Sequence, residues 1–260
     1  LTTKSWSEIT PTGAKPEART DHTAVLYGSK MVIFGGHLDP SGNPNDVWEL
    51  DLSNPTAWSQ YTITGTKPVG RESPISVLYG SKMIVHGGSG WLSGVWELDL
   101  DNPTQWVKRT TSEEISGRNC ATVLYGNKMI IMGGYIDGYQ LDVKVWALDL
   151  TTNVWEEFGP DILGVRNKPL AVLDGSNVYL FGGYDSGSKN DVWKLDLSNP
   201  TAWVDVNPTG YVAGRTHAIG VIDAGKLIIW GGNTGGSYVT DVMEALDLTT
   251  NTWSEITPLG

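Results

Sequence analysis

The sequence has little of several features that stabilise or mark small proteins. Cys120 is the only cysteine, so no internal disulfide can form and stability has to come from packing. Since Cys120 stands in an apolar run, we expect a buried, inert thiol. No apolar run approaches the roughly 18 residues of a membrane span, so no membrane partner is expected. No charged-then-apolar leader opens the chain, and the sequence therefore gives no localisation.

Basic residues are also scarce. The chain has 18 Lys and Arg against 29 Asp and Glu, a formal net charge of −11 at pH 7. Nucleic acids are bound by positively charged surfaces, so this composition argues against a nucleic-acid partner. An acidic surface still leaves room for a cationic partner.

The motifs of common enzymes are missing as well. There is no G-x-S-x-G, no H-E-x-x-H and no phosphate-binding loop. His22 and His217 are better explained as structural residues than as acid–base groups. Asp39, Asn43 and Asp46 offer oxygen ligands, but their spacing is not that of a calcium loop. We therefore expect no metal and no cofactor, and a binding function rather than an enzymatic one.

What the sequence does contain is one pattern that occurs five times. Diglycines recur at steps of 46 to 52 residues, and their first members are Gly35, Gly87, Gly133, Gly182 and Gly231. An arginine stands 15 or 16 residues before each of them: Arg19, Arg71, Arg118, Arg166 and Arg215. A tryptophan recurs with nearly the same period at Trp6, Trp58, Trp106, Trp155, Trp203 and Trp253. Three residue types that keep one period of roughly 50 residues indicate a repeat architecture.

This pattern resembles the kelch repeat, which has an arginine, an apolar run, a diglycine, an aromatic residue before Leu-Asp and a closing tryptophan. The resemblance covers nearly the whole chain. It implies an all-β fold, a kelch-type β-propeller of four-stranded antiparallel blades. Five repeats give five blades, although rings of this family usually have six or seven. The resemblance also implies that the commonest ligand is a protein partner.

The residues support this fold independently. In the first repeat, residues 23–27 and 30–34 are β-branched and apolar runs separated by Gly-Ser, which predicts a hairpin. Residues 47–52 alternate between apolar and polar and predict a third strand, and residues 58–63 a fourth. One such sheet leaves apolar side chains in water, so each sheet needs a neighbour, and arrangement around an axis supplies one.

Two departures from the pattern leave alternatives open. The fifth repeat has Glu244 where the others have a tryptophan, so its third strand either contains a bulge, which we favour, or faces a different neighbour. Residues 5–10 repeat the closing strand found near residue 253, which gives six such strands for five repeats. The extra strand is a spare edge, joins another protomer, or marks a piece of a longer ring. We expect a single domain over residues 1–260, with repeats at roughly 11–63, 64–110, 111–159, 160–207 and 208–258 and the extra strand at 5–10.

Strand direction predicts which end of the propeller binds. In an antiparallel meander, the loops between second and third strands share one end with the links between repeats, and these are the long, variable connections here. Variable loops on a rigid scaffold are the usual site of recognition. They carry aromatic residues suited to protein hot spots or to stacking on sugars: Trp91, Tyr135, Tyr139, Tyr184, Tyr211 and Tyr238.

The repeated arginines form a second candidate group at the same end. By symmetry we expect all five around the mouth of the central channel. They either pair with acidic neighbours such as Asp21, Glu72 and Asp46, which we favour, or hold a carboxylate or phosphate. We therefore expect a non-catalytic recognition module that binds a protein partner through the end with the long loops. The alternative is a carbohydrate or small-anion site at the channel mouth, lectin-like or sugar-modifying, formed by arginines and loop aromatics.

Overall fold

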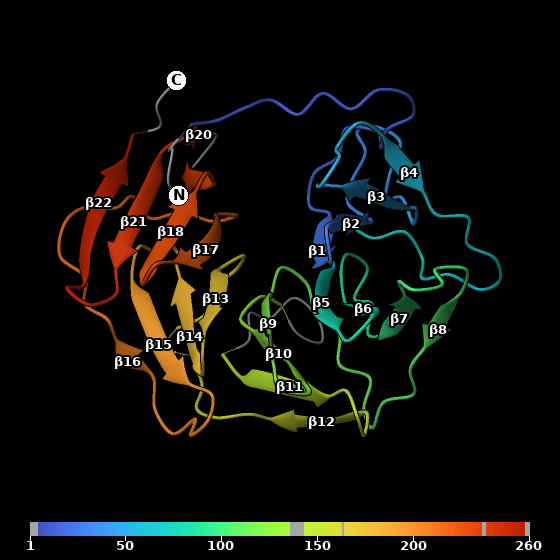
Figure 1. Ribbon diagram of the computed structural model, residues 1–260. Helices are drawn as coiled ribbons and strands as arrows, with labels where there is room; N and C mark the ends of the chain where they lie inside the picture. The colour runs from blue at the N-terminus through green and yellow to red at the C-terminus, as the bar shows by residue number, and fades with distance from the viewer. Residues whose placement is uncertain (1–4, 136–142, 163, 236–237, 258–260) are drawn as a thin grey trace.

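The computed structural model describes residues 5–135, 143–162, 164–235 and 238–257, and these form strands and loops without helices. Five four-stranded antiparallel sheets, the blades, stand around a central axis as a β-propeller (Figure 1). No helix in the described part of the chain could cross a membrane. The all-β propeller predicted from the repeat is thus confirmed.

Each blade consists of consecutive strands that run from the innermost to the outermost position. The first three blades contain β1 (Thr23–Tyr27), β2 (Lys30–Phe34), β3 (Val47–Asp51) and β4 (Trp58–Gln60); β5 (Ile75–Tyr79), β6 (Lys82–His86), β7 (Trp96–Asp99) and β8 (Trp106–Lys108); and β9 (Ala121–Tyr125), β10 (Lys128–Met132), β11 (Val145–Asp149) and β12 (Val154–Glu157). The last two contain β13 (Leu170–Asp174), β14 (Asn177–Phe181), β15 (Val192–Asp196) and β16 (Val204–Asp205); and β17 (Ile219–Asp223), β18 (Lys226–Trp230), β21 (Met243–Asp247) and β22 (Thr252–Ile256). A small hairpin of β19 (Asn233–Gly235) and β20 (Tyr238–Val239) lies between β18 and β21.

The strands predicted in the first repeat agree closely with those observed. The first two coincide with β1 and β2, and β3 is one residue shorter than predicted. The fourth strand ends at Gln60 instead of Ile63. After Gln60 the chain leaves the sheet, and Ile63 packs into the apolar core between the first and second blades.

The predicted bulge in the fifth blade is wrong. Ile229 pairs with Glu244 and Trp230 with Met243, so β21 continues in regular register. The same register places Trp193 opposite Leu180 in the fourth blade. Glu244 therefore occupies the tryptophan position itself, and its carboxylate is buried there because it accepts a hydrogen bond of 2.7 Å from Arg215.

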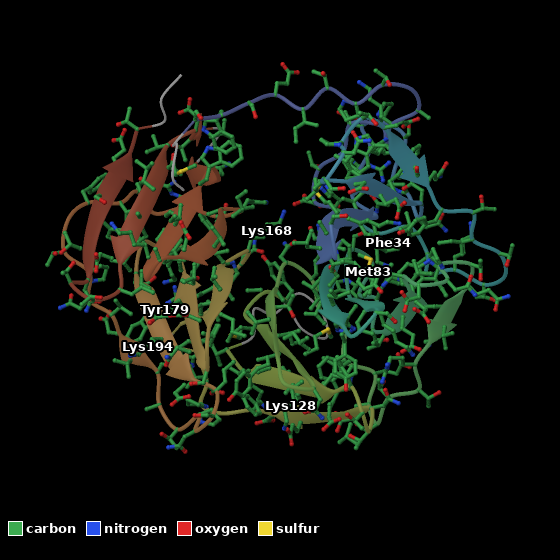
Figure 2. The ribbon with its side chains drawn as sticks, in the orientation of Figure 1. Phe34, Met83, Lys128, Lys168, Tyr179 and Lys194 are labelled. Carbon is green, nitrogen blue, oxygen red and sulfur yellow. The ribbon has the colours of Figure 1, made fainter. Side chains whose placement is uncertain are left out.

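Apolar side chains between neighbouring blades form the core. Phe34 of the first blade, for example, packs in one cluster with Met83 of the second (Figure 2). Similar clusters join the second blade to the third, the third to the fourth and the fourth to the fifth. Full burial of one such side chain contributes about 1.5–3 kcal/mol, so the rigidity of the scaffold comes from these interfaces.

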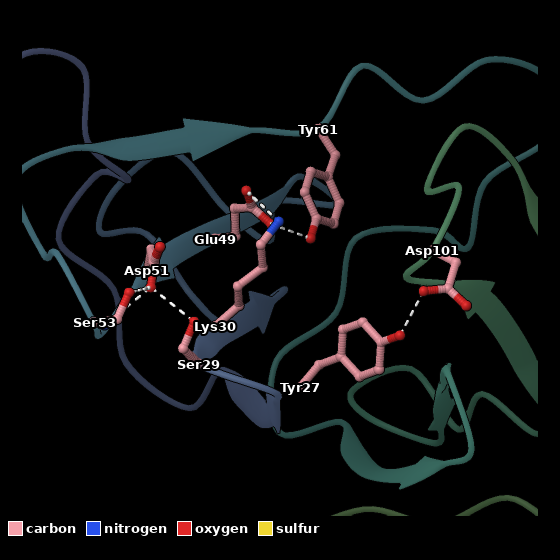
Figure 3. A network of polar contacts seen from close by, with 8 residues as sticks. All are labelled: Tyr27, Ser29, Lys30, Glu49, Asp51, Ser53, Tyr61 and Asp101. Atoms are coloured by element: carbon pink, nitrogen blue, oxygen red, sulfur yellow. Dashed lines mark hydrogen bonds and ion pairs between the residues drawn. The ribbon is translucent and has the colours of Figure 1, made fainter.

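Polar side chains on the first blade are engaged with one another (Figure 3). Lys30 contacts both carboxylate oxygens of Glu49 at 3.0 and 3.1 Å, and the Tyr61 hydroxyl donates to Glu49. Burial, together with this hydrogen bond to Glu49, raises the pKa of Tyr61. The Tyr27 hydroxyl donates to Asp101 of the second blade at 2.5 Å. These contacts join strands of the first blade to one another and the first blade to the second.

Candidate functional site at the mouth of the central channel

The long connections gather at one end of the propeller, as strand direction predicts. Single-residue bridges pair the link before an inner strand with the residue that follows a diglycine: Thr20 with His37, Asn167 with Tyr184, and Thr216 with Asn233. We call this end, which carries the loops between second and third strands and the links between blades, the long-loop face.

Four of the five repeated arginines lie inside the blades. Arg71, Arg166 and Arg215 are at most 2% exposed, and the side chain of Arg19 is 4% exposed. Each donates a hydrogen bond to the carbonyl of the first glycine of its diglycine, at 2.9 to 3.3 Å. Three of them also bind a carboxylate at 2.6 to 2.7 Å, and these pairs are Arg19–Asp46, Arg166–Asp191 and Arg215–Glu244.

Burial shifts the pKa values of the arginines and of the carboxylates in opposite directions. Burial lowers the pKa of Arg71 to about 10, because the charged form loses water. Burial alone raises the pKa of Asp191, but hydrogen bonds from Arg166 and Trp193 and the charge of Arg166 outweigh it, so this pKa is lowered. The arrangement holds the diglycine turn to the start of the third strand. The predicted role of these arginines in anion binding stays a prediction.

Arg118 is placed differently from the other four. The second glycine of the first diglycine, Gly36, donates its N–H to the carbonyl of Arg71. In the next repeat, Gly88 donates in the same way to the carbonyl of Gly117, so Gly117 stands at the position that the buried arginines occupy elsewhere. The Arg118 side chain is 34% exposed and lies 3.4 Å from Glu72. The spacing of 15 residues to Gly133, instead of 16, was the sequence signal for this shift.

The loop aromatics do not form one cluster. Trp91 and Tyr135 contact each other edge to face, with ring centroids 6.3 Å apart. Tyr184 and Tyr211 are 45% and 83% exposed. Tyr139 and the side chain of Tyr238 lie outside the described residues. The described aromatics are thus split between one contacting pair and two separate exposed rings.

A cavity of about 410 Å³ opens on the long-loop face and is lined by the segments that precede the inner strands. Each blade contributes a polar residue at one equivalent position, and we call these the mouth residues: Asp21, Ser73, Asn119, Lys168 and His217. All five have a left-handed backbone, with φ between 52° and 60°. Non-glycine residues rarely adopt this conformation, and it is concentrated at functional sites.

Backbone hydrogen bonds connect the mouth residues of neighbouring blades. Ser73 N donates to Asp21 O at 2.9 Å, Lys168 N to Asn119 O at 2.9 Å, and His217 N to Lys168 O at 3.3 Å. The sequence singled out Asp21 and His217 but not the whole set, whose members stand one or two residues after each repeated arginine. Their side chains share no residue type, so the pattern was visible only in position.

Charged groups meet across this cavity. Lys168 Nζ, which points toward the centre of the ring in Figure 2, lies 3.0 Å from Asp21 Oδ1 and so joins the fourth blade to the first. His217 Nε2 lies 3.9 Å from the same oxygen. Asn119 is only 9% exposed, and its Oδ1 and the Ser73 Oγ have no hydrogen-bond partner among the described residues. The cavity therefore offers polar groups that a bound group can satisfy.

Cys120 also lines this cavity and is only partly buried, so the expectation of a fully buried thiol is wrong. Cys120 directly follows the mouth residue Asn119, so it lies at the channel edge of the apolar cluster between the second and third blades and packs against that cluster. No group of three or more metal-binding side chains occurs within the described ranges.

Acidification is expected to destabilise the protein through two histidines of this cavity. Burial and then the charge of Lys168 lower the pKa of His217, and burial and then Arg19 lower that of His22. The folded state thus binds these protons less readily than the unfolded state, whose histidines titrate near pH 6.5. The stabilising contribution is complete above that pH and is lost as pH falls through the lower folded pKa.

Thermal unfolding between pH 7 and 5 measures this loss of stability. His217→Gln should flatten this dependence, and an unchanged slope would contradict the assignment.

Comparison with known proteins supplies the family. A family model described as the KLHDC2/KLHL20/DRC7 Kelch-repeats domain matches residues 1–164 and 119–260. The chain belongs to the kelch-repeat family. Relatives of this kelch chain include the leucine-zipper-like transcriptional regulator 1 homolog of Drosophila melanogaster, 33% identical over 91 residues, and host cell factor 2 of Homo sapiens, 37% identical over 89. The Rab9 effector protein with kelch motifs of Mus musculus is 32% identical over 88 residues.

These alignments are partial on both sides. They cover 33%, 32% and 33% of the kelch chain and 9%, 11% and 23% of the respective relatives. The matches therefore support the repeat and its fold, and what the whole relatives do is not transferred with them.

Proposed function

We propose that this kelch chain is a non-catalytic recognition module that binds a protein partner through the long-loop face. The observation that carries the proposal is that exposed tyrosines and polar residues with a left-handed backbone lie on the same end of a rigid propeller. Tyr184 and Tyr211 are exposed there, and the mouth residues surround an open polar cavity. Exposed tyrosines are enriched among residues that dominate protein interfaces.

The charge of the chain indicates the chemistry of the partner. A net charge of −11 favours a partner with a basic surface and accelerates its association at low ionic strength. Kelch relatives are named as a Rab9 effector and as host cell factors, names that are in keeping with protein interactions. In this proposal, the loop aromatics contribute most of the affinity and the mouth residues contribute specificity.

A double variant tests the role of the exposed rings. Tyr184→Ala with Tyr211→Ala should leave the unfolding temperature unchanged, because both rings are solvent-exposed. The dissociation constant of a captured partner should rise about tenfold or more, since loss of one interface hot spot costs roughly 2 kcal/mol. Quantitative pull-down followed by titration of the purified partner measures this change.

Leu52→Ala provides the matched control. Leu52 is 41% exposed and stands directly after β3, at the tight-turn end. Its removal should leave partner binding unchanged. Equal losses in the double variant and the control would contradict the assignment to the long-loop face. So would stabilisation by a sugar or an organic acid, with protein binding unaffected by the double variant.

A further inference from the structure

The fifth and first blades do not share the kind of apolar cluster that joins the other neighbouring blades among the described residues. Each apolar cluster between blades combines residues of two consecutive repeats. The fifth cluster is different, because Ile228, Met243, Ala245 and Ile256 all belong to the fifth blade. Figure 1 shows the N-terminal segment running alone between the fifth blade and the first.

The fifth blade exposes apolar side chains that the other blades bury. Val221 is 53% exposed, whereas its counterparts in the first three blades are 6% to 7% exposed: Val25, Val77 and Val123. Ile219 is 59% exposed and Trp230 is 37% exposed on the same blade. We call these three residues the open face. An exposed apolar group of this kind marks an interaction surface.

The first blade shows the complementary deficit on its other side. Leu78, Leu124 and Leu173 each pack into the core shared with the preceding blade. Leu26 holds the same place in the first blade and is 59% exposed. Both walls of the interval between the fifth and first blades thus present apolar residues that lack the usual neighbour.

The N-terminal segment has the sequence of a fourth strand but not its structure. SWSEITP at residues 5–11 nearly repeats TWSEITP at residues 252–258. Residues 5–11 nevertheless form no strand, and Trp6 is 59% exposed, whereas Trp106, Trp155 and Trp253 are 4% to 6% exposed. Trp6 leans on Trp230, with ring centroids 5.0 Å apart, beside a cavity of about 430 Å³.

Thr12, which follows this segment, is docked like its counterparts at other blade junctions. Thr12 N donates to Thr56 O at 2.7 Å. After the fourth strands of the first and fourth blades, Thr64 N donates to Thr104 O at 2.8 Å and Thr209 N to Asn251 O at 2.7 Å. Residues 5–11 therefore leave the interval in the way a fourth strand does, but within the described residues they belong to no sheet.

We propose that the open face and residues 5–10 form the docking surface for a sixth kelch blade. Its occupant is a three-stranded antiparallel sheet, apolar on both faces, that uses residues 5–10 as its fourth strand. A repeat joined in line after the fifth blade is the occupant that fits, because all four existing blade interfaces join consecutive repeats of one chain. The surface lies on the side of the propeller, and of the open-face residues Ile219 also lines the channel cavity.

The proposal can be tested with a sixth blade built from the sequence of the first repeat. Residues 252–260 match residues 5–13 at seven of nine positions, so a copy of residues 14–52 appended after Gly260 recreates a natural junction followed by three strands. Hydrogen–deuterium exchange should show the amides of residues 5–10 and β17 slowed about tenfold or more in the extended protein, because paired strand amides open rarely. The emission of Trp6 and Trp230 should shift to shorter wavelength, and the protein should remain a monomer.

A matched extension with Val25→Ser, Val32→Ser and Phe34→Ser in the appended copy should give no protection. The proposal is overturned if the amides of the intact appended copy exchange as fast as those of an unfolded segment while the five blades remain folded. Equal protection by a separate peptide of residues 14–52 overturns the in-line occupant. Slow exchange of residues 5–10 in the 260-residue chain itself, equal to that of β22, also overturns it. None of these outcomes depends on partner binding at the long-loop face.

Discussion

Replacement of Arg166 by alanine is expected to lower the free energy of unfolding by about 3–4 kcal/mol. The guanidinium group is fully buried and binds Gly182 O at 3.0 Å and both carboxylate oxygens of Asp191 at 2.7 Å. Removal of one partner of a buried ion pair costs roughly 3–5 kcal/mol because the other charge is left uncompensated. The expected loss lies at the lower end of this range, since the Asp191 side chain is 36% exposed and can regain water.

Arg118→Ala is the control for this experiment within the same chain. Arg118 belongs to the same sequence pattern, but its side chain is 34% exposed and its contact with Glu72 is long, at 3.4 Å. Such surface pairs contribute about 0–1 kcal/mol. Urea denaturation gives both values by linear extrapolation. Equal losses in the two variants would show that the buried position of Arg166 has no special importance.

Gly87→Ala is expected to cost a further large amount, about 2–5 kcal/mol. Gly87 has φ of 68°, and a left-handed backbone costs an L-residue about 1–2 kcal/mol. An alanine Cβ would also lie 2.0 Å from Gly117 O, a backbone atom that cannot move without shifting the third blade. Overpacking of this kind adds about 1–3 kcal/mol.

Gly80→Ala separates these two contributions. Gly80 has a similar φ of 62°, in the turn between β5 and β6, but nothing lies within 4 Å of an added Cβ. Only the backbone cost of about 1–2 kcal/mol should remain. Thermal and urea denaturation of the two variants compare them directly. A Gly80→Ala variant as unstable as Gly87→Ala would mean that the contact with the next blade is unimportant.

The fold could be predicted from the sequence because the repeat fixes it five times over. Apolar runs on either side of Gly28-Ser29 gave β1 and β2 at their observed bounds. The predictions of strand geometry failed where a single residue departs from the repeat. Glu244 suggested a bulge because it stands where the other repeats have a tryptophan, and its bond to buried Arg215 lets it occupy that core position in regular register.

The candidate site was less predictable than the fold. Spacing along the chain placed the arginines near the channel, but it could not show which way their side chains turn. Their hydrogen bonds to the diglycine carbonyls turn them into the blades. The cavity is instead lined by residues of different types, such as Lys168 and Asn119, whose common feature is backbone conformation. A left-handed φ shared by different residue types cannot be predicted from composition or periodicity.

The circle of left-handed residues at the channel also bears on how such proteins diversify. Three main-chain hydrogen bonds join neighbouring members, as from Ser73 to Asp21, and these joints do not depend on the side chain that each position carries. Acid, base, amide and hydroxyl already occupy equivalent places in one molecule. Evolution can therefore exchange them one at a time and retune selectivity while every interface between sheets stays intact.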